Sequence, residues 1–212
     1  NWCVEEISRE TSKFWNGWPL TSNQKPDWGA SCSNFYVENN TCKCPDANFG
    51  DSEQVTVNGE QKTFTKRTRA QLDALIDADI NDPEIALSCT SGITDMSNLF
   101  RDTDFNQNIN FWDTSNVTNM SFMFFNTNLF NKPINNWDVS AVLNMRYMFN
   151  FSSFNQPLSD WNVSNVSNMS SMFNGNSSFN QPLNSWDVSN VTNMNSMFYN
   201  ATSFNQELDN WD

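Results

Sequence analysis

Histidine is absent from this chain of 212 residues. Its absence removes the most common general base and metal ligand. No phosphate-binding loop, dinucleotide-binding glycine pattern or Gly-x-Ser-x-Gly nucleophile motif occurs either. Carboxylate pairs serve as acid and base in glycosidases, but the acidic residues here follow a repeat or cluster on a predicted helix. We therefore expect no enzymatic activity.

Basic residues are also scarce: 11 lysines and arginines face 24 aspartates and glutamates, which gives a net charge of −13. Nucleic acids and anionic membrane surfaces are bound through clusters of lysine and arginine, so neither is an expected partner. No apolar run approaches the length of a membrane span, so we expect no membrane insertion. The acidic balance favours solubility, and cations or basic molecules as partners.

Only five cysteines are present, and all precede the repeats: Cys3, Cys32, Cys42, Cys44 and Cys89. This segregation predicts an N-terminal region held by disulfides in an oxidising compartment. A zinc site is disfavoured because the Cys42–Cys44 spacing is tight and no histidine can assist. Among Cys3, Cys32 and Cys42 we expect one pair and one remaining thiol, either free or intermolecular.

What the chain has in abundance is a repeat. Tryptophan recurs at intervals of 25, 24, 25 and 25 residues, at Trp112, Trp137, Trp161, Trp186 and Trp211. A fixed period of this size is typical of a solenoid, in which each unit buries its apolar face against its neighbours. The predicted fold class is an α/β-type repeat solenoid with short parallel strands and short helical segments, about 25 residues per coil.

Other residue types keep the same period. Phenylalanine, methionine, valine and leucine or isoleucine form further columns, among them those beginning at Phe100 and Phe105. We expect these columns and the tryptophans to form a thin continuous core, with the tryptophans not serving as a sugar-binding surface. Two asparagine columns, beginning at Asn106 and Asn119, are expected to satisfy backbone hydrogen bonds between adjacent coils.

Local signals place short elements within each coil. A serine before the valine–methionine run predicts a short helical or 3₁₀ segment, near residues 191–198 in the last coil. The strand is expected at the Phe-Asn-Gln-Pro-Leu stretch, where proline forbids one ladder bond and keeps the strand short. The alternative places the strand at the Trp-Asp-Val-Ser stretch.

Three regions are predicted along the chain. Residues 1–54, rich in cysteine and tryptophan, are expected to be irregular. Residues 55–90 contain an Asn-Gly hairpin signal between strand formers and an amphipathic helix over residues 68–78. This hairpin–helix unit is expected to cap the first coil of the third region, residues 91–212.

The pattern F-N-Q-P-L-x-x-W-D-V-S-N-V-x-N-M-x-x-M-F recurs four times in residues 91–212 and resembles the BspA-type leucine-rich repeats of surface and secreted proteins. The flank is also similar, at Cys44-Pro45, Val57-Asn-Gly59, Leu72 to Leu75 and Cys89-Thr-Ser-Gly-Ile-Thr-Asp-Met96. The resemblance implies a right-handed solenoid of leucine-rich-repeat-like coils that serves adhesion or assembly outside the cell, with no reaction. It also implies a disulfide between Cys44 and Cys89.

The start of the chain bears on localisation. It begins at Asn1 without a basic-then-apolar leader, so we expect that a signal peptide has been removed or that this is a fragment. Together with the cysteines and the resemblance, this predicts a secreted or cell-surface protein.

An acidic column is the one candidate cation site: Asp113, Asp138, Asp187 and Asp212. Carboxylates stacked at this period repel each other unless they are paired or bind a cation such as calcium. Asn162 occupies the same column without charge, so hydrogen bonds to the turn are the favoured role and calcium the lesser alternative. No other cofactor is expected.

Asparagine sequons are a further candidate for modification. Three recur at nearly the same place in successive coils, in the loop between two phenylalanine columns, and one lies near the N-terminus: Asn150, Asn176, Asn200 and Asn39. We predict that glycans are attached at these four asparagines if the source glycosylates its secreted proteins.

The sequence stops at Asp212, in the middle of a coil. An uncapped coil exposes apolar columns and unpaired backbone, which favours association. Contact between this end and the N-terminal region of another copy does not close, so it generates a filament. The residues predicted for the contact are Phe198, Phe204, Leu208 and Trp211 at one end and Trp2 and Trp15 at the other.

The predicted function is therefore that of an extracellular structural protein that self-associates head to tail, into a glycosylated filament or surface layer. The alternative is a monomeric adhesin or a module of a longer surface protein that binds other extracellular proteins or glycans.

Overall fold

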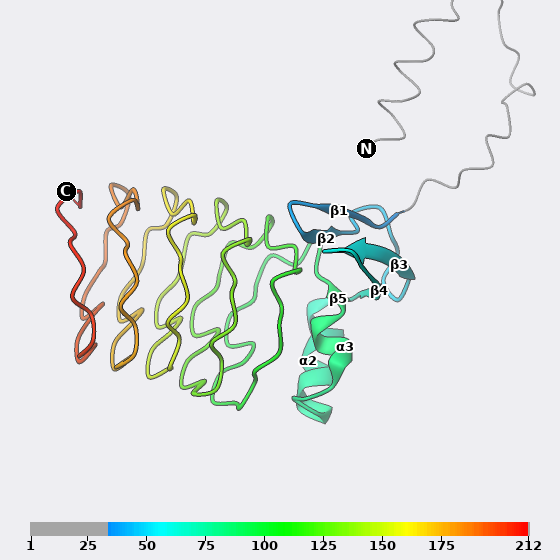
Figure 1. Cartoon of the computed structure of the whole chain (residues 1–212), viewed down its shortest axis with the longest axis horizontal. Coiled ribbons are helices and arrows are strands. Elements are labelled where there is room, and N and C mark those ends of the chain that lie inside the picture. The colour runs from blue at the N-terminus through cyan, green and yellow to red at the C-terminus, as the bar shows by residue number, and fades with distance from the viewer. Residues whose placement is uncertain (1–33, 212) are drawn as a thin grey trace, which may run out of the picture. The chain divides into compact units, whose positions relative to one another are not determined.

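The computed structural model describes residues 34–211, nearly all of which belong to one compact unit, Phe35–Asp212. Helices and strands are confined to the beginning of this unit (Figure 1). In chain order they are β1 (Tyr36–Glu38), β2 (Thr41–Lys43), β3 (Ser52–Val57), β4 (Glu60–Lys66), α2 (Arg69–Ala78), α3 (Pro83–Ala86) and β5 (Ser88–Cys89). None of the described helices is long and apolar enough to cross a membrane.

Two antiparallel hairpins open the unit. Strands β3 and β4 pair around Asn58 and Gly59, whose φ angles of 51° and 81° are both left-handed, as a two-residue hairpin turn requires. The predicted hairpin is thus confirmed. Strands β1 and β2 form the other hairpin, with Asn39 and Asn40 left-handed at its turn, so the prediction of irregular structure is wrong over residues 36–43 and again from residue 52, where β3 begins. Strand β5 adds to β4 in parallel.

The predicted helix over residues 68–78 is confirmed as α2. It begins with a capping box, in which the Thr68 hydroxyl accepts from Gln71 N–H and the Gln71 side chain accepts from Thr68 N–H. Its one fully buried side chain, Leu72, packs into the core that continues through the repeats. Helix α3, which was not predicted, begins at an Asp82 N-cap followed by proline.

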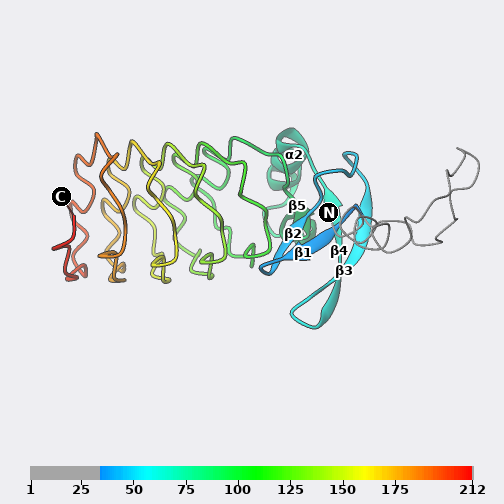
Figure 2. The same cartoon turned by 90° about the horizontal axis from the view of Figure 1, so that it is seen from above.

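From residue 91 to residue 211 the chain forms turns and irregular segments without any helix or strand. Neighbouring repeats are joined by isolated parallel bridges, each of one residue pair: Asp95–Asn119, Asn119–Asn144, Asn144–Asn168 and Asn168–Asn193. Successive repeats therefore lie side by side (Figure 1, Figure 2). The predicted fold class is wrong, because an α/β-type solenoid needs strands and helical segments in the repeats, whereas the described chain confines them to two small sheets and two helices before the repeats.

Backbone conformation explains why no helix forms in the repeats. One column has φ between 54° and 59° in every repeat: Asn98, Phe122, Tyr147, Ser171 and Ser196. A left-handed residue interrupts an α-helix, and this is why residues 191–198 are not helical. The Phe-Asn-Gln-Pro-Leu and Trp-Asp-Val-Ser stretches form no strand either, so both predicted strand positions are wrong.

The phenylalanine columns form the predicted core. The rings of Phe124, Phe149 and Phe173 are fully buried and stack with centroids 5.6 Å apart at each step. Phe154, from the second column, stacks on Phe149 at 4.3 Å. Each ring therefore has aromatic neighbours both within its repeat and in the adjacent ones, which binds the repeats into one apolar core.

The tryptophans are also core residues, as predicted. Trp137, Trp161 and Trp186 are at most 3% exposed and stack with centroids 6.5 Å apart. The indole N–H of each donates to a carbonyl of the preceding repeat, for example Trp186 to Leu158 at 2.9 Å. Packing and hydrogen bonding thus occupy both parts of the side chain, as is usual for buried tryptophan.

One asparagine column carries the predicted hydrogen bonds to the backbone of the adjacent repeat, whereas the other bonds the backbone of its own repeat. The side-chain oxygens of Asn131, Asn155 and Asn180 each accept the backbone N–H of the equivalent asparagine in the next repeat at 2.9 Å. In the other column, Asn119 Oδ1 accepts the N–H two residues later, as do its equivalents. These columns therefore satisfy backbone groups along the surface.

Candidate functional site

Every junction between neighbouring repeats is held by the same backbone hydrogen bonds. At the first junction four N–H groups donate forward at 2.9–3.0 Å: Met96 to Asn119, Asn98 to Ser121, Phe100 to Met123 and Asp102 to Phe125. The equivalent positions do the same at the next three junctions, and a backward bond such as Thr118 N–H to Thr94 accompanies them. Each repeat thus has an edge of four N–H donors, the donor edge, and an opposite edge of four carbonyls, the acceptor edge.

Helix α2 covers the acceptor edge of the first repeat. The Arg69 guanidinium donates to the carbonyls of Asp95 and Ser97, both at 2.9 Å, where a preceding repeat would otherwise donate. Further along, the Gln107 side chain donates to the carbonyls of Ile80 and Asp82, between the two helices. The helices therefore act as the cap that was predicted from the sequence.

The donor edge of residues 191–211 has no such cover within the described chain. The N–H groups of Met194, Ser196, Phe198 and Asn200, equivalent to the forward donors of earlier repeats, make no hydrogen bond there. Four apolar side chains beside them are only partly buried: Phe198, Phe204, Leu208 and Trp211. These are the residues predicted for self-association; Trp2 and Trp15 lie outside the described residues.

A buried carboxylate joins the hairpins to the first repeat. Asp113 is 4% exposed and accepts hydrogen bonds from Lys43 Nζ at 2.6 Å, Ser91 Oγ at 2.5 Å and Ser115 Oγ at 2.7 Å. Burial alone would raise the pKa of the Asp113 carboxyl. The hydrogen bonds from these three residues and the charge of Lys43 outweigh burial, so the pKa lies below its usual range.

Replacing this carboxylate by an amide tests the junction. In Asp113→Asn we expect the free energy of unfolding to fall by about 1–3 kcal/mol at neutral pH, because a charged acceptor is lost while Lys43 stays largely buried. The pKa of Asp113 is lower in the folded state than in the unfolded state, where it is about 3.9. The carboxylate therefore stabilises the folded state fully above about pH 3.9, and this stabilisation is lost as the pH falls through the lower folded pKa. Urea unfolding should show a smaller difference in the free energy of unfolding between variant and wild type at pH 3 than at pH 7.

Asp187→Asn is the matched control. Asp187 occupies the same column but is exposed, and Asn162 already fills that column in the repeat before it. Its variant should unfold as the wild type does at both pH values. Equal losses in the two variants would mean that Asp113 has no special role.

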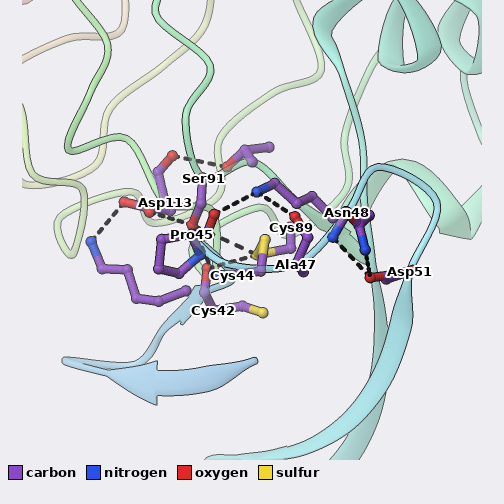
Figure 3. The surroundings of a disulfide bond; sticks show 12 residues. Cys42, Cys44, Pro45, Ala47, Asn48, Asp51, Cys89, Ser91 and Asp113 are labelled. Carbon is purple, nitrogen blue, oxygen red and sulfur yellow. Dashed lines mark hydrogen bonds and ion pairs between the residues drawn. A yellow bond between two sulfur atoms is a disulfide. The ribbon is translucent and has the colours of Figure 1, made fainter. Parts of the chain in front are cut away.

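The disulfide implied by the resemblance is present, between Cys44 and Cys89 (Figure 3). It links the chain after β2 to β5, and Cys44 N–H donates to Ser91 Oγ, which in turn donates to Asp113. The Cys42 thiol is free and buried; burial, then the charges of Asp113 and Glu53, raises its pKa to about 12. Such a thiol is unreactive at neutral pH, which argues against an intermolecular bond through it. Cys3 and Cys32 lie outside the described residues.

Two of the four predicted glycosylation sites are wrong. Asn150 and Asn176 are at most 1% exposed, and their side-chain nitrogens, the atoms to which a glycan attaches, donate to protein oxygens. The sequons lie in the predicted loop, but that loop turns the asparagines inward. Asn39 and Asn200 are exposed, and they stay predictions.

Expression in a eukaryotic host that secretes the protein tests the exposed sequons, Asn39 and Asn200, against the buried ones, Asn150 and Asn176. Glycopeptide mapping of the folded product should find glycans at Asn39 and Asn200 and none at Asn150 or Asn176, because a glycan cannot fit where the amide is buried. The secreted protein provides its own control, since all four peptides come from one sample. A glycan at Asn150 or Asn176 in folded material would contradict the structure.

The acidic column makes the hydrogen bonds favoured from the sequence. Asp138 and Asp187 each accept the N–H and the hydroxyl of the serine two residues later, and Asn162 does the same. Among the described residues no group of three acidic or cysteine side chains is placed to hold a metal ion. Asp212 lies outside that range. The lack of enzymatic activity stays a prediction.

One exposed feature was not predicted. Two arginines cover three aromatic rings on the outside of the repeats, a group that we name the aromatic–arginine surface: Arg101, Phe122, Phe125, Arg146 and Tyr147. The Phe122 and Tyr147 rings stack at 4.7 Å. Hydrogen bonds with Ser171 and Arg146 lower the pKa of the Tyr147 hydroxyl. The sequence did carry a sign of this surface. Tyr147 departs from the repeat, since later repeats have serine in its column.

Comparison with known proteins addresses the repeats. No curated protein and no solved structure shows significant similarity to the chain. One protein family matches residues 73–153 and again residues 150–212, which together span 140 of the 212 residues. The chain therefore belongs to the family described as Mycoplasma protein of unknown function, DUF285.

Proposed function

We propose that this protein is an extracellular structural protein, without catalytic activity, whose copies associate head to tail. The donor edge of residues 191–211 carries the proposal. It holds the same four N–H groups that join every pair of repeats in the described chain, here without acceptors. A surface that has already joined four pairs of repeats is well suited to accept one more segment.

The energetics favour occupation of this edge. Each backbone hydrogen bond contributes about 0.5–1.5 kcal/mol, and four are available. Burial of the exposed parts of Phe198, Phe204 and Trp211 adds about 25 cal/mol for each Å² of apolar surface covered. At the earlier junctions the equivalent rings are fully or almost fully buried, as Phe173, Phe179 and Trp186 are.

The first repeat of a second copy is the less suitable partner for this edge. Arg69 at the start of α2 already donates to two of the four carbonyls at its acceptor edge, those of Asp95 and Ser97, so a full set of bonds there would displace this side chain. We therefore propose that the contact is made by the N-terminal region before residue 35, which includes Trp2 and Trp15. Because the two surfaces differ, the contact does not close and copies can continue to add.

An extracellular location is part of the proposal. A disulfide such as Cys44–Cys89 persists in oxidising compartments and is rare in the cytosol. The resemblance of the repeats to BspA-type surface and secreted proteins supports the same location.

Sedimentation velocity over a range of protein concentrations tests the association. The wild-type chain should form species larger than a monomer as its concentration rises. Leu208→Glu places a charge at the donor edge and should shift assembly to at least tenfold higher concentration, equivalent to about 1.4 kcal/mol. Leu129→Glu is the matched control, since Leu129 is 55% exposed and lies in an earlier repeat. A wild-type chain that is monomeric at every concentration would defeat the proposal.

The aromatic–arginine surface favours a second candidate, a monomeric adhesin or binding module. Aromatic and arginine side chains are enriched where proteins bind partners. If this candidate is right, the wild type should sediment as a monomer at every concentration. The Leu208→Glu variant should then sediment as the wild type does.

A further inference from the structure

Beside the aromatic–arginine surface lies an open pocket of about 270 Å³. Its lining spans three successive repeats and includes Arg146, Tyr147, Ser171, Asn193, Asn195 and Ser196. Clefts for drug-sized ligands usually measure about 300–1,000 Å³, so this pocket is suited to a single ring of a larger, exposed molecule.

The pocket begins where an aromatic stack ends. The Tyr147 ring is covered by Phe122 on one side, with planes inclined by only 6°. The next two positions of this column hold Ser171 and Ser196, whose side chains are too small to continue the stack. The aromatic stack therefore ends at Tyr147, and the pocket that Tyr147 and Arg146 line beyond it can take a planar or chair-shaped ring from a ligand.

The backbone shows that this aromatic pair is not required by the fold. Phe122 and Tyr147 are left-handed, with φ of 59° and 58°, a conformation that is unfavourable for bulky residues. Asn98, Ser171 and Ser196 adopt the same conformation in other repeats. Large rings held in a strained conformation, where small residues serve the fold equally well, point to a role on the surface.

The polar lining indicates the chemistry of the ligand. Asn193 Nδ2, the side-chain amide of Asn195 and the Ser196 hydroxyl make no hydrogen bond within the described chain, so they are free to meet hydroxyl groups. No carboxylate lines the pocket, although the chain has 24 acidic residues. Arg146 lies 4.8 Å from the Tyr147 ring centre and forms no ion pair with any described carboxylate.

We propose that this pocket binds an acidic saccharide, with one pyranose ring stacked on Tyr147 and its carboxylate paired with Arg146. The apolar face of the sugar covers the open ring, and its hydroxyl groups meet the asparagine and serine side chains. A guanidinium can bind a carboxylate through two parallel hydrogen bonds, which gives preference for acidic over neutral sugars. The inference does not rest on self-association, although Ser196 belongs both to the pocket lining and to the donor edge.

Isothermal titration with oligomers of glucuronate or galacturonate, against neutral glucose oligomers of equal length, tests the proposal. The wild-type chain should bind the acidic oligomers at least tenfold more tightly. The variants copy the following repeat and so preserve the local backbone. Tyr147→Ser should weaken acidic binding at least tenfold, and Arg146→Ser should abolish the preference for acid. Tyr199→Ser, which removes another exposed ring, should change neither.

Three results would overturn the proposal. The first is the absence of any acidic-saccharide binding up to about 10 mM, a concentration well above the range of useful recognition. The second is equal binding by the wild type and Tyr147→Ser. The third is binding of N-acetylphenylalaninamide without binding of sugar, which would assign the pocket to a protein side chain. A chain that binds saccharide but stays monomeric would refute self-association alone.

Discussion

Replacement of Phe149 by alanine is expected to lower the free energy of unfolding by about 3–5 kcal/mol, as for other buried phenylalanines. The ring is fully buried and stacks on Phe124, Phe154 and Phe173, in its own repeat and both neighbours. Removing it leaves a cavity in a core only a few side chains wide, with little room for the surroundings to collapse. Urea unfolding, with the midpoint compared at constant slope, measures the loss.

Phe151→Ala is the matched control, because Phe151 belongs to the same repeat but is 53% exposed. Its ring makes one edge-on aromatic contact, with Phe125, and lies against Gly175 at the surface, so its loss should stay below about 1 kcal/mol. Comparable losses at positions 149 and 151 would show that the stacked columns are not what stabilises the repeats.

Loss of the Cys44–Cys89 disulfide is the second large expected effect. The bond spans 45 residues, and closing a loop of that length stabilises the folded state by about 4 kcal/mol in the chain-entropy account. We expect the paired replacement Cys44→Ala with Cys89→Ala to lose about 2–4 kcal/mol, measured by urea unfolding. Treating the wild type with a reducing agent should lower its midpoint in the same direction.

Cys42→Ala separates the covalent effect from packing. Cys42 is equally buried in the same small cluster but forms no bond, so its replacement should cost about 1 kcal/mol. If the oxidised and reduced wild-type proteins unfold at the same urea concentration, the disulfide contributes nothing and this account of the cap is wrong.

Short sequence signals predicted the local structure correctly where the residue type determines the backbone conformation. Asn58-Gly59 predicted a turn because both residues tolerate positive φ, and Thr68 predicted a helix start, which the structure shows as a capping box with Gln71. The periodic apolar residues correctly predicted the core, because only burial explains rings at a fixed spacing. The Cys44–Cys89 pairing came from a resemblance and not from spacing.

The fold class was wrong for a physical reason. Phenylalanine and tyrosine rarely adopt positive φ, so nothing at Phe122 or Tyr147 indicates the left-handed conformation that interrupts the predicted helical segments. The forward N–H bonds that join the repeats depend on this conformation, and they too could not be foreseen.

The site predictions failed where burial mattered. A sequon records two residue types and says nothing of exposure, so Asn150 and Asn176 could not be told from Asn200. The hairpin β1–β2 was missed because its strands have only three residues each. The aromatic–arginine surface could have been predicted from the sequence, because Phe122 and Tyr147 stand in a column where later repeats have serine.

Hydrogen exchange at single amides tests the central claim, that the donor edge of residues 191–211 binds a second copy. In dilute solution four N–H groups should exchange rapidly: Met194, Ser196, Phe198 and Asn200. Their equivalents one repeat earlier should be protected at every concentration: Met169, Ser171, Phe173 and Gly175. We predict that the first group becomes protected as the protein concentration rises. If these four amides exchange at the same rate in dilute and concentrated protein, the claim is contradicted.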